Sequence, residues 1–235
     1  MLIVVLLSTI VFSNAAENTF PDRHKFGHGG RMDGWLFFKR HMKYYMLKRT
    51  YIVPGGSQNA MCVQAPFSPI VYTNEYKMEK TFTYRNMSSI HKVDPNNNLS
   101  APHWPVAKFL MQFYVSKDKR KYTYLISNQG YNYVNSTNLT TAYGYSLPAP
   151  DWRFMYISRH CVVMSVSSLT FLLPGVKPQC ELWVSVNKTN TDRAFYHQKN
   201  WNECDIFMKR RCNKDQEEQV YDSQICGPVY QATKE

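Results

Sequence analysis

Short apolar and aromatic runs, separated by Pro, Gly, Asn or Ser, recur along most of the chain. Runs of this length and composition, bounded by turn-forming residues, are typical of β-strands. The candidate strands are residues 43–53, 60–65, 77–85, 106–115, 121–127, 153–157, 160–168 and 180–187. Residues 93–105 and most of residues 128–150 are rich in Asn, Pro, Gly or Tyr, which predicts loops.

One helix is predicted after the last strand. In residues 199–212, apolar side chains recur at near-helical spacing, and an extended tail to Cys226 is expected to follow. About eight strands in series, with no alternation of strand and helix, indicate an antiparallel sandwich or barrel. The single late helix favours an eight-stranded barrel, whose interior has room for one small ligand. The pattern therefore suggests a carrier.

The first residues differ from the rest of the chain. Residues 2–12 form one apolar run, and small residues and then Glu17 follow it. This is the pattern of a secretory signal peptide, and the run is shorter than the roughly 20 apolar residues of a transmembrane helix. We predict a signal peptide over residues 1–16 and a single domain over residues 17–235, secreted and with no membrane partner.

Composition and charge limit the function classes. The 235 residues carry 28 Lys and Arg against 17 Asp and Glu, a net charge of +11. The densest basic runs, 117–122 and 208–212, have no nucleic-acid-binding motif beside them and are interpreted as solvated faces. The seven His residues are scattered, and no catalytic or metal-ligand motif occurs. We therefore expect neither an enzyme nor a metal, cofactor or nucleic-acid site.

Cysteines and glycosylation sequons agree with secretion. An even number of Cys behind a signal peptide predicts disulfide bonds, although six allow 15 pairings. The cysteines are Cys62, Cys161, Cys180, Cys204, Cys212 and Cys226. Five N-x-S/T sequons predict N-glycosylation on the surface. They begin at Asn86, Asn98, Asn135, Asn138 and Asn187.

Six segments, in order along the chain, carry a family resemblance. They are KYYMLKRTY at 43–51, AMCVQA at 60–65, HCVVMSV at 160–166, CELW at 180–183, ECDIFMKRRC at 203–212 and YDSQIC at 221–226. Together they resemble the histamine-binding lipocalins of tick saliva. The resemblance implies an all-β, eight-stranded antiparallel lipocalin barrel with a C-terminal helix packed on its wall. It also implies a secreted protein that sequesters a small host mediator. Its disulfide pattern carries over as Cys62–Cys226, Cys161–Cys204 and Cys180–Cys212.

The resemblance also implies a ligand site in two parts. The family's late-strand motif, which supplies a carboxylate and an aromatic face, is intact with Glu181 and Trp183. Its early motif survives in part, with Asp33 and Trp35, and Tyr51 is expected to join the site if it faces inward. A carboxylate among aromatic rings would suit a biogenic amine such as histamine. Alternatively, Trp35 closes the barrel floor and Glu181 points to solvent.

A second ligand class remains open. Strict alternation would place Arg49 and Tyr51 on one face with Tyr45, Leu47 and Val53. An inward Arg49 would suit the carboxylate of a leukotriene or fatty acid, whereas an Arg49 at the barrel mouth would keep its head in water. The preferred function is thus amine capture by a monomer. The alternatives are an anionic-lipid scavenger and a lipocalin that acts on host proteins through its outer surface.

Overall fold

A computed structural model describes most of the predicted domain. The described residues are 33–66, 68–87, 104–115, 132–142, 144–169, 176–186 and 201–226. The predicted signal peptide, the strand expected at 121–127, Asn98 and Asn187 lie outside them.

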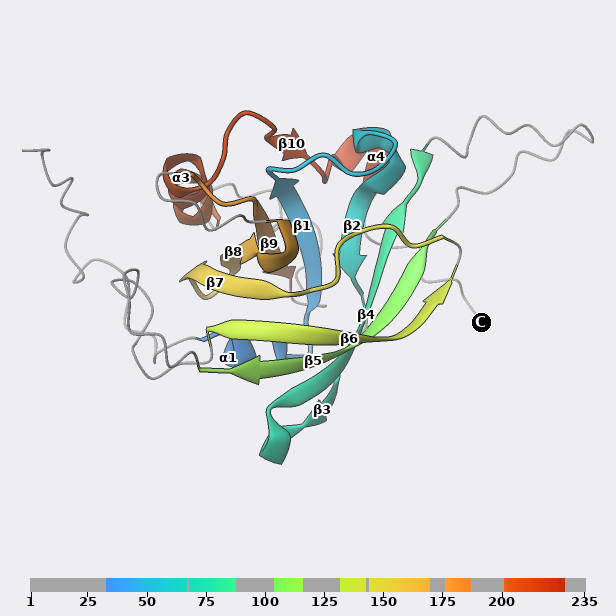
Figure 1. Ribbon diagram of the computed structural model, residues 1–235, viewed down its shortest axis with the longest axis vertical. Coiled ribbons are helices and arrows are strands. Elements are labelled where there is room, and N and C mark those ends of the chain that lie inside the picture. Colours follow the sequence, from blue (N-terminus) through green and yellow to red (C-terminus); the bar gives the residue numbers. More distant parts are fainter. Residues whose placement is uncertain are drawn as a thin grey trace, which may run out of the picture. The chain divides into compact units, whose positions relative to one another are not determined.

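Eight antiparallel strands close into a barrel, as predicted (Figure 1). Each strand pairs with the next around the barrel, and β9 returns to pair with β1. The strands are β1 (Lys43–Arg49), β2 (Met61–Ala65), β4 (Lys77–Arg85), β5 (Val106–Tyr114), β6 (Tyr133–Ala142), β7 (Trp152–Ile157), β8 (Cys161–Val166) and β9 (Cys180–Val186). A closed barrel leaves its strands without the exposed edges of an open sheet.

Shorter strands and helices lie beside the eight strands of this barrel. Strand β3 (Ile70–Tyr72) pairs with β4 off the barrel path, and β10 (Glu218–Gln219) pairs with β1. Helix α1 (Gly34–Phe38) precedes the first strand, and α3 (Asn202–Arg211) confirms the predicted late helix. The tail expected to be extended ends instead in the one-turn helix α4 (Ser223–Cys226). No described helix is long and apolar enough to cross a membrane.

The prediction of a loop over most of residues 128–150 was wrong for β6. This strand holds Asn, Ser and Thr, which suggested a loop, but its three threonines are β-branched and suit a strand. Among the described residues, β6 pairs with β5 along nearly its whole length, yet with β7 only through Tyr133 and Val134. The chain must therefore run back from the far end of β6 to β7, and it does so through residues 144–150.

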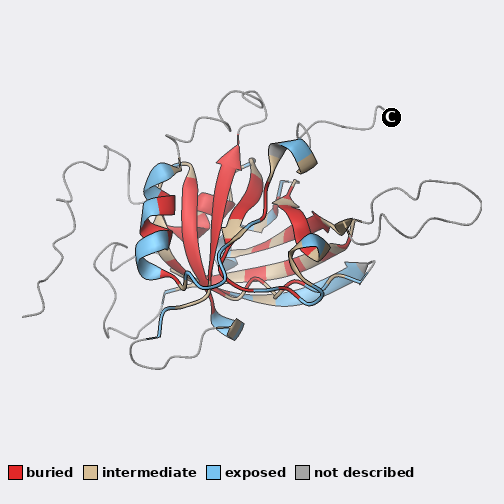
Figure 2. Cartoon of the chain, turned by 90° about the horizontal axis from the view of Figure 1, so that it is seen from above, coloured by how far each residue is buried: buried red, intermediate tan, exposed pale blue. Residues whose placement is uncertain are grey.

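Two apolar cores lie on opposite sides of the barrel wall. The inner core fills the barrel with side chains such as Met46, Phe82 and Trp183. The outer core lies between β1, β8 and β9 and the helix α3, and it contains Leu182 and Phe207. Because both faces of β8 and β9 are covered, every residue of these two strands is buried (Figure 2).

An irregularity in β1 corrects the expected facing of its residues. The pairing with β9 shifts register between Met46 and Lys48. Tyr45 before the shift and Leu47 at the shift lie in the outer core. After the shift, Arg49 pairs with Glu181 of β9 and Tyr51 lies in the inner core. The expectation that Tyr45, Leu47, Arg49 and Tyr51 share one face was therefore wrong, because a bulge reverses the alternation of faces.

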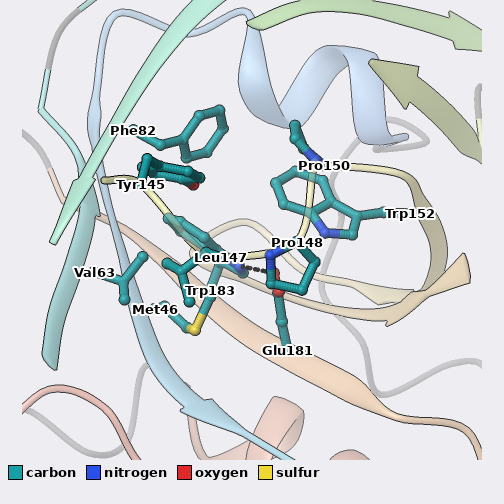
Figure 3. A pocket seen from close by; sticks show the side chains of 10 residues that line it. All are labelled: Met46, Val63, Phe82, Tyr145, Leu147, Pro148, Pro150, Trp152, Glu181 and Trp183. Carbon is teal, nitrogen blue, oxygen red and sulfur yellow. Dashed lines mark hydrogen bonds between the residues drawn. The ribbon is translucent and has the colours of Figure 1, made fainter. Parts of the chain in front are cut away.

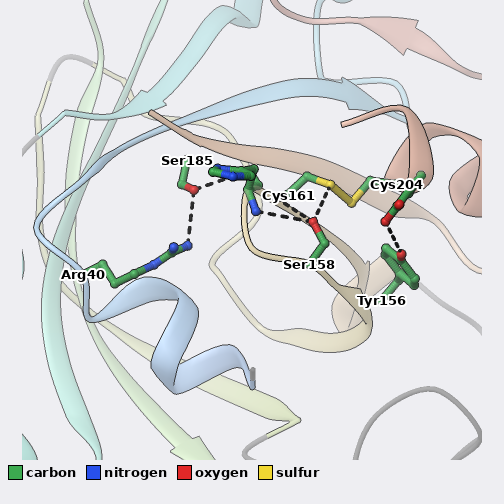
Figure 4. The surroundings of a disulfide bond; sticks show 8 residues. Arg40, Tyr156, Ser158, Cys161, Ser185 and Cys204 are labelled. Atoms are coloured by element: carbon green, nitrogen blue, oxygen red, sulfur yellow. Dashed lines mark hydrogen bonds between the residues drawn. A yellow bond between two sulfur atoms is a disulfide. The ribbon is translucent and has the colours of Figure 1, made fainter. Parts of the chain in front are cut away.

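The three disulfides that the resemblance implied are all present. Cys161–Cys204 and Cys180–Cys212 join strands β8 and β9 to α3, and Cys62–Cys226 joins β2 to the tail. Figure 4 shows the first of these, with Tyr156 nearby. The Tyr156 hydroxyl donates to the Glu203 carboxylate of α3 at 2.9 Å. The helix is thus held to the wall by covalent bonds as well as by the outer core.

Candidate functional site

A small cavity lies inside the barrel (Figure 3). The space between its walls that is not filled by atoms, part of it open to solvent, is about 220 Å³. Its walls come from strands β1, β2, β4, β7 and β9 and from the segment that returns from β6 to β7. The lining residues are Met46, Val63, Phe82, Tyr145, Leu147, Pro148, Pro150, Trp152, Glu181 and Trp183.

Glu181 supplies the charge of this cavity. Of the described residues that line it, Glu181 alone has a charged side chain. The residue is 2% exposed, and both carboxylate oxygens accept hydrogen bonds. The Tyr51 hydroxyl donates to Oε1 at 2.6 Å, and the Trp183 indole Nε1 donates to Oε2 at 2.7 Å. These two donors fix the orientation of the carboxylate before any ligand arrives.

The outer core explains why Glu181 points inward. The apolar residues Leu182, Val184 and Val186 alternate with it along β9, and in a barrel with a solvated wall they would face the interior. Here they pack instead against α3. Glu181 and Trp183 are thereby left on the inner face, which is the arrangement that the resemblance favoured. Ser185 lies on the same face but accepts from Arg40 at 3.2 Å, away from the described cavity.

Burial raises the pKa of the Glu181 carboxyl above its ordinary value. Hydrogen bonds from Tyr51 and Trp183, together with the positive charge of Arg49, oppose this rise by stabilising the ionised form. The site therefore holds a carboxylate that is poorly solvated by water but well supplied with donors. A cation that entered the cavity would stabilise the ionised form further.

Three aromatic rings line the cavity together with Glu181. The ring centroids of Phe82, Trp152 and Trp183 lie 5.7–5.9 Å from one another, at steep interplanar angles. Aromatic faces attract cations through their quadrupole, most strongly where water is excluded. The combination of one carboxylate with several ring faces suits a small ligand that carries one positive charge on an aromatic or aliphatic body.

Arg49 does not line the described cavity. Its guanidinium is fully buried, and it donates to the Glu218 carboxylate at 2.7 Å and to the Ala60 carbonyl at 2.9 Å. The expectation that its head would reach water at the barrel mouth was therefore wrong. Its charge is paired within the protein, and its nearest effect on the site is to favour the ionised form of Glu181.

The two residues of the early motif lie apart from this cavity. Asp33 caps α1, its carboxylate accepting from the backbone amide of Leu36 at 2.7 Å. Trp35 packs edge-to-face on Tyr76 and Phe113. Both are buried, and neither lines the described cavity. The structure thus brings together Tyr51, Glu181 and Trp183, and places Asp33 and Trp35 elsewhere in the barrel.

A buried lysine is a feature that the sequence analysis missed. Lys80 of β4 is 1% exposed, and its Nζ lies 4.3 Å from the centroid of the Tyr44 ring. Burial lowers the pKa of Lys80 to about 7. Strict inward–outward alternation along β4, where Met78, Lys80 and Phe82 are all buried, was the signal that could have found it.

Sequence reasoning also missed the residues that close the cavity. Tyr145, Leu147, Pro148 and Pro150 lie in a segment predicted to be an ordinary loop, yet their side chains line the cavity (Figure 3). Leu147 and Pro150 are buried. Apolar residues between prolines were the available signal, but a loop's position over a barrel depends on the strands that flank it. No cluster of metal-ligating side chains occurs among the described residues.

Comparison with known proteins identifies the family. The family model described as tick histamine binding protein matches residues 28–227. The chain belongs to the tick histamine-binding protein family. The fold and the family together describe a ligand-binding barrel protein of the lipocalin type.

The other two comparisons add little about the ligand of this chain. Among solved structures, the chain is similar to Japanin from Rhipicephalus appendiculatus bound to cholesterol, with 12% identity and a TM-score of 0.45. That match covers 80% of this chain and 97% of the other. A search of curated protein sequences finds no significant match. Within the tick histamine-binding protein family, the ligand of this chain must therefore be argued from its own cavity.

Proposed function

We propose that this protein captures a small biogenic amine, such as histamine or serotonin, inside its barrel. The observation that carries the proposal is the buried Glu181 carboxylate, which lines the cavity beside three aromatic rings. The ammonium group would pair with Glu181, and the ligand body would lie among Phe82, Trp152 and Trp183. A charge-assisted hydrogen bond in a site without water is stronger than the same bond in solvent.

The lining of the cavity supports the same ligand class. Apart from Glu181, the residues that line it have aromatic or aliphatic side chains, which suit the body of an aromatic amine. The anionic-lipid alternative lacks a corresponding support. Its candidate counter-charge, Arg49, is paired with Glu218 and does not line the described cavity.

The pH dependence of amine binding tests this proposal. Serotonin suits the test because its ammonium group stays protonated across the acidic range, as a Lys side chain does. Glu181 must be ionised to pair with it, and burial raises the pKa of this carboxyl. Affinity should therefore be constant above that pKa and fall about tenfold for each pH unit below it. Calorimetric titration from neutral to acidic pH measures this.

Lys80 requires a matched control. Because burial lowers its pKa to about 7, this side chain gains positive charge in the same pH range and would also repel a cation. Lys80→Met removes that contribution and should keep the decline in affinity at acidic pH. A serotonin affinity that is independent of pH in Lys80→Met would contradict the role proposed for Glu181.

We further propose that the protein is secreted as a glycosylated monomer. The three disulfides support an oxidising compartment. Of the described sequon residues, Asn135 and Asn138 are exposed on β6, and Asn86 is partly exposed at the end of β4. Each of these positions would leave room for a glycan outside the barrel.

A further inference from the structure

We propose that Tyr84 holds a cap over the cavity and thereby limits the ligand to small molecules. The cap segment is residues 144–150, the return from β6 to β7. This inference deepens the proposed function, because it concerns which ligands the same cavity admits. It depends on contacts of the cap segment that are independent of the Glu181 carboxylate.

The Tyr84 hydroxyl is bound to the cap segment at its first residues. It accepts a hydrogen bond from the Ser146 backbone amide at 3.0 Å, and it lies 3.0 Å from the Ser146 hydroxyl and 3.4 Å from the Gly144 carbonyl. Tyr84 itself is 1% exposed and anchored in β4. Its ring also packs on Tyr145, with the centroids 5.3 Å apart. A rigid strand residue thus holds a segment whose Ser146 is exposed to solvent.

The other end of the cap segment is anchored separately. The Asp151 carboxylate accepts from the Ser136 backbone amide of β6 at 2.7 Å, and the Asp151 carbonyl accepts from the Ser167 amide at 2.8 Å. At the N-terminal end of the segment, Gly144 has a φ of +70°. Glycine adopts this conformation without steric strain, and it lets the chain reverse sharply. Two prolines stiffen the part between. When Tyr84 releases the segment, its Gly144 end is therefore expected to swing outward, with the Asp151 end still anchored.

The cap segment sets the size of the cavity. Tyr145, Leu147, Pro148 and Pro150 are four of the ten residues that line it (Figure 3). While they stay in place, their side chains cover part of the space beside Phe82, Trp152 and Trp183. If the segment swings outward, the space above Trp152 and Trp183 opens to solvent. A bulky apolar ligand could then enter, and a bound amine could leave more quickly.

The hydrogen bonds between the Tyr84 hydroxyl and the cap segment act as a latch. Tyr84→Phe tests this latch, because it removes the hydroxyl and keeps the ring. A hydrogen bond of this kind typically shifts an equilibrium by about three- to tenfold. The Ser146 amide should therefore exchange its hydrogen about three- to tenfold faster, as measured by NMR. Serotonin should dissociate faster by a similar factor in stopped-flow experiments. Uptake of diphenylhexatriene, a neutral and bulky fluorescent probe, should increase above that of the unmodified protein.

Tyr114→Phe is the matched control. It removes a tyrosine hydroxyl from the neighbouring strand β5, where that hydroxyl donates to the exposed Asn135 side chain at 3.1 Å. This variant should leave all three readouts unchanged. An unaltered Ser146 exchange rate in Tyr84→Phe would overturn the latch. Faster exchange without increased probe uptake would overturn its role in selecting ligand size. Both readouts apply even if serotonin does not bind, so they separate this inference from the proposed function.

Discussion

Replacing Glu181 with Gln is expected to weaken serotonin and histamine binding by about ten- to a hundredfold at neutral pH. A hydrogen bond to a charged group contributes roughly 1.5–3 kcal/mol, and each 1.4 kcal/mol is about tenfold in affinity. The variant loses the negative charge while keeping the size of the side chain. Isothermal titration calorimetry of the unmodified protein and the variant measures the change directly.

The surroundings of Glu181 require a check on folding. Both of its oxygens accept hydrogen bonds, from Tyr51 and Trp183. A Gln side chain has one accepting oxygen, so one of these donors will lose its partner, although the cost of a buried charge is also removed. Glu203→Gln is the matched control. Glu203 also accepts from a tyrosine hydroxyl, that of Tyr156, but it is exposed on α3 outside the barrel.

The two variants separate a local from a general effect of charge. Both remove one negative charge from a protein whose net charge is +11. Glu203→Gln should bind amines as the unmodified protein does. Equal weakening in the two variants would mean that the overall charge, rather than the cavity carboxylate, governs amine affinity. Melting temperatures measured alongside show whether any loss in Glu181→Gln reflects unfolding.

Removal of the bridge between Cys62 and Cys226 is expected to have the largest effect on stability. The bridge spans 164 residues, and in the chain-entropy model a loop of this length contributes roughly 5 kcal/mol to the free energy of unfolding. Cys62→Ala combined with Cys226→Ala leaves no free thiol. Cys62 has a left-handed backbone conformation, with a φ of +56°. An Ala at this position would adopt the same conformation, so backbone strain should not change.

Urea unfolding measures this loss of stability. The double variant Cys180→Ala with Cys212→Ala provides a comparison, because that bridge closes a loop of only 32 residues. Its removal should cost about 1.4 kcal/mol less in the same model. If removal of the Cys62–Cys226 bridge left the unfolding midpoint unchanged, the tail would already be held by its other contacts. One such contact is the hydrogen bond from the Cys62 amide to the Val220 carbonyl at 2.9 Å.

Much of the fold could be predicted because it depends on local patterns. Short aromatic and β-branched runs mark most strands of the barrel, and the spacing of apolar residues marks α3. Strand β6 was missed because its Asn, Ser and Thr side chains are typical of loops, and nearly full pairing with β5 determines its structure. Propensity is a weak guide where pairing with a neighbouring strand decides the conformation.

The site was predictable only in part, for the same reason. The inward facing of Glu181 depends on α3 covering the outer face of β9, which the alternation of residues in β9 does not show by itself. The facing of Arg49 depends on one bulge in β1, and its partner Glu218 lies 169 residues away in the sequence. The cap segment lines the cavity because β6 and β7 separate after two residue pairs. Each of these contacts is set by the assembled barrel.

Competition for the cavity tests the central claim most directly. The purified protein is incubated with equal concentrations of serotonin and palmitate, and a native mass spectrum records which ligand it retains. We expect one serotonin on each protein molecule and no palmitate, with the serotonin lost from Glu181→Gln. Retention of palmitate without serotonin, in the unmodified protein and in Glu181→Gln alike, would contradict amine capture by Glu181.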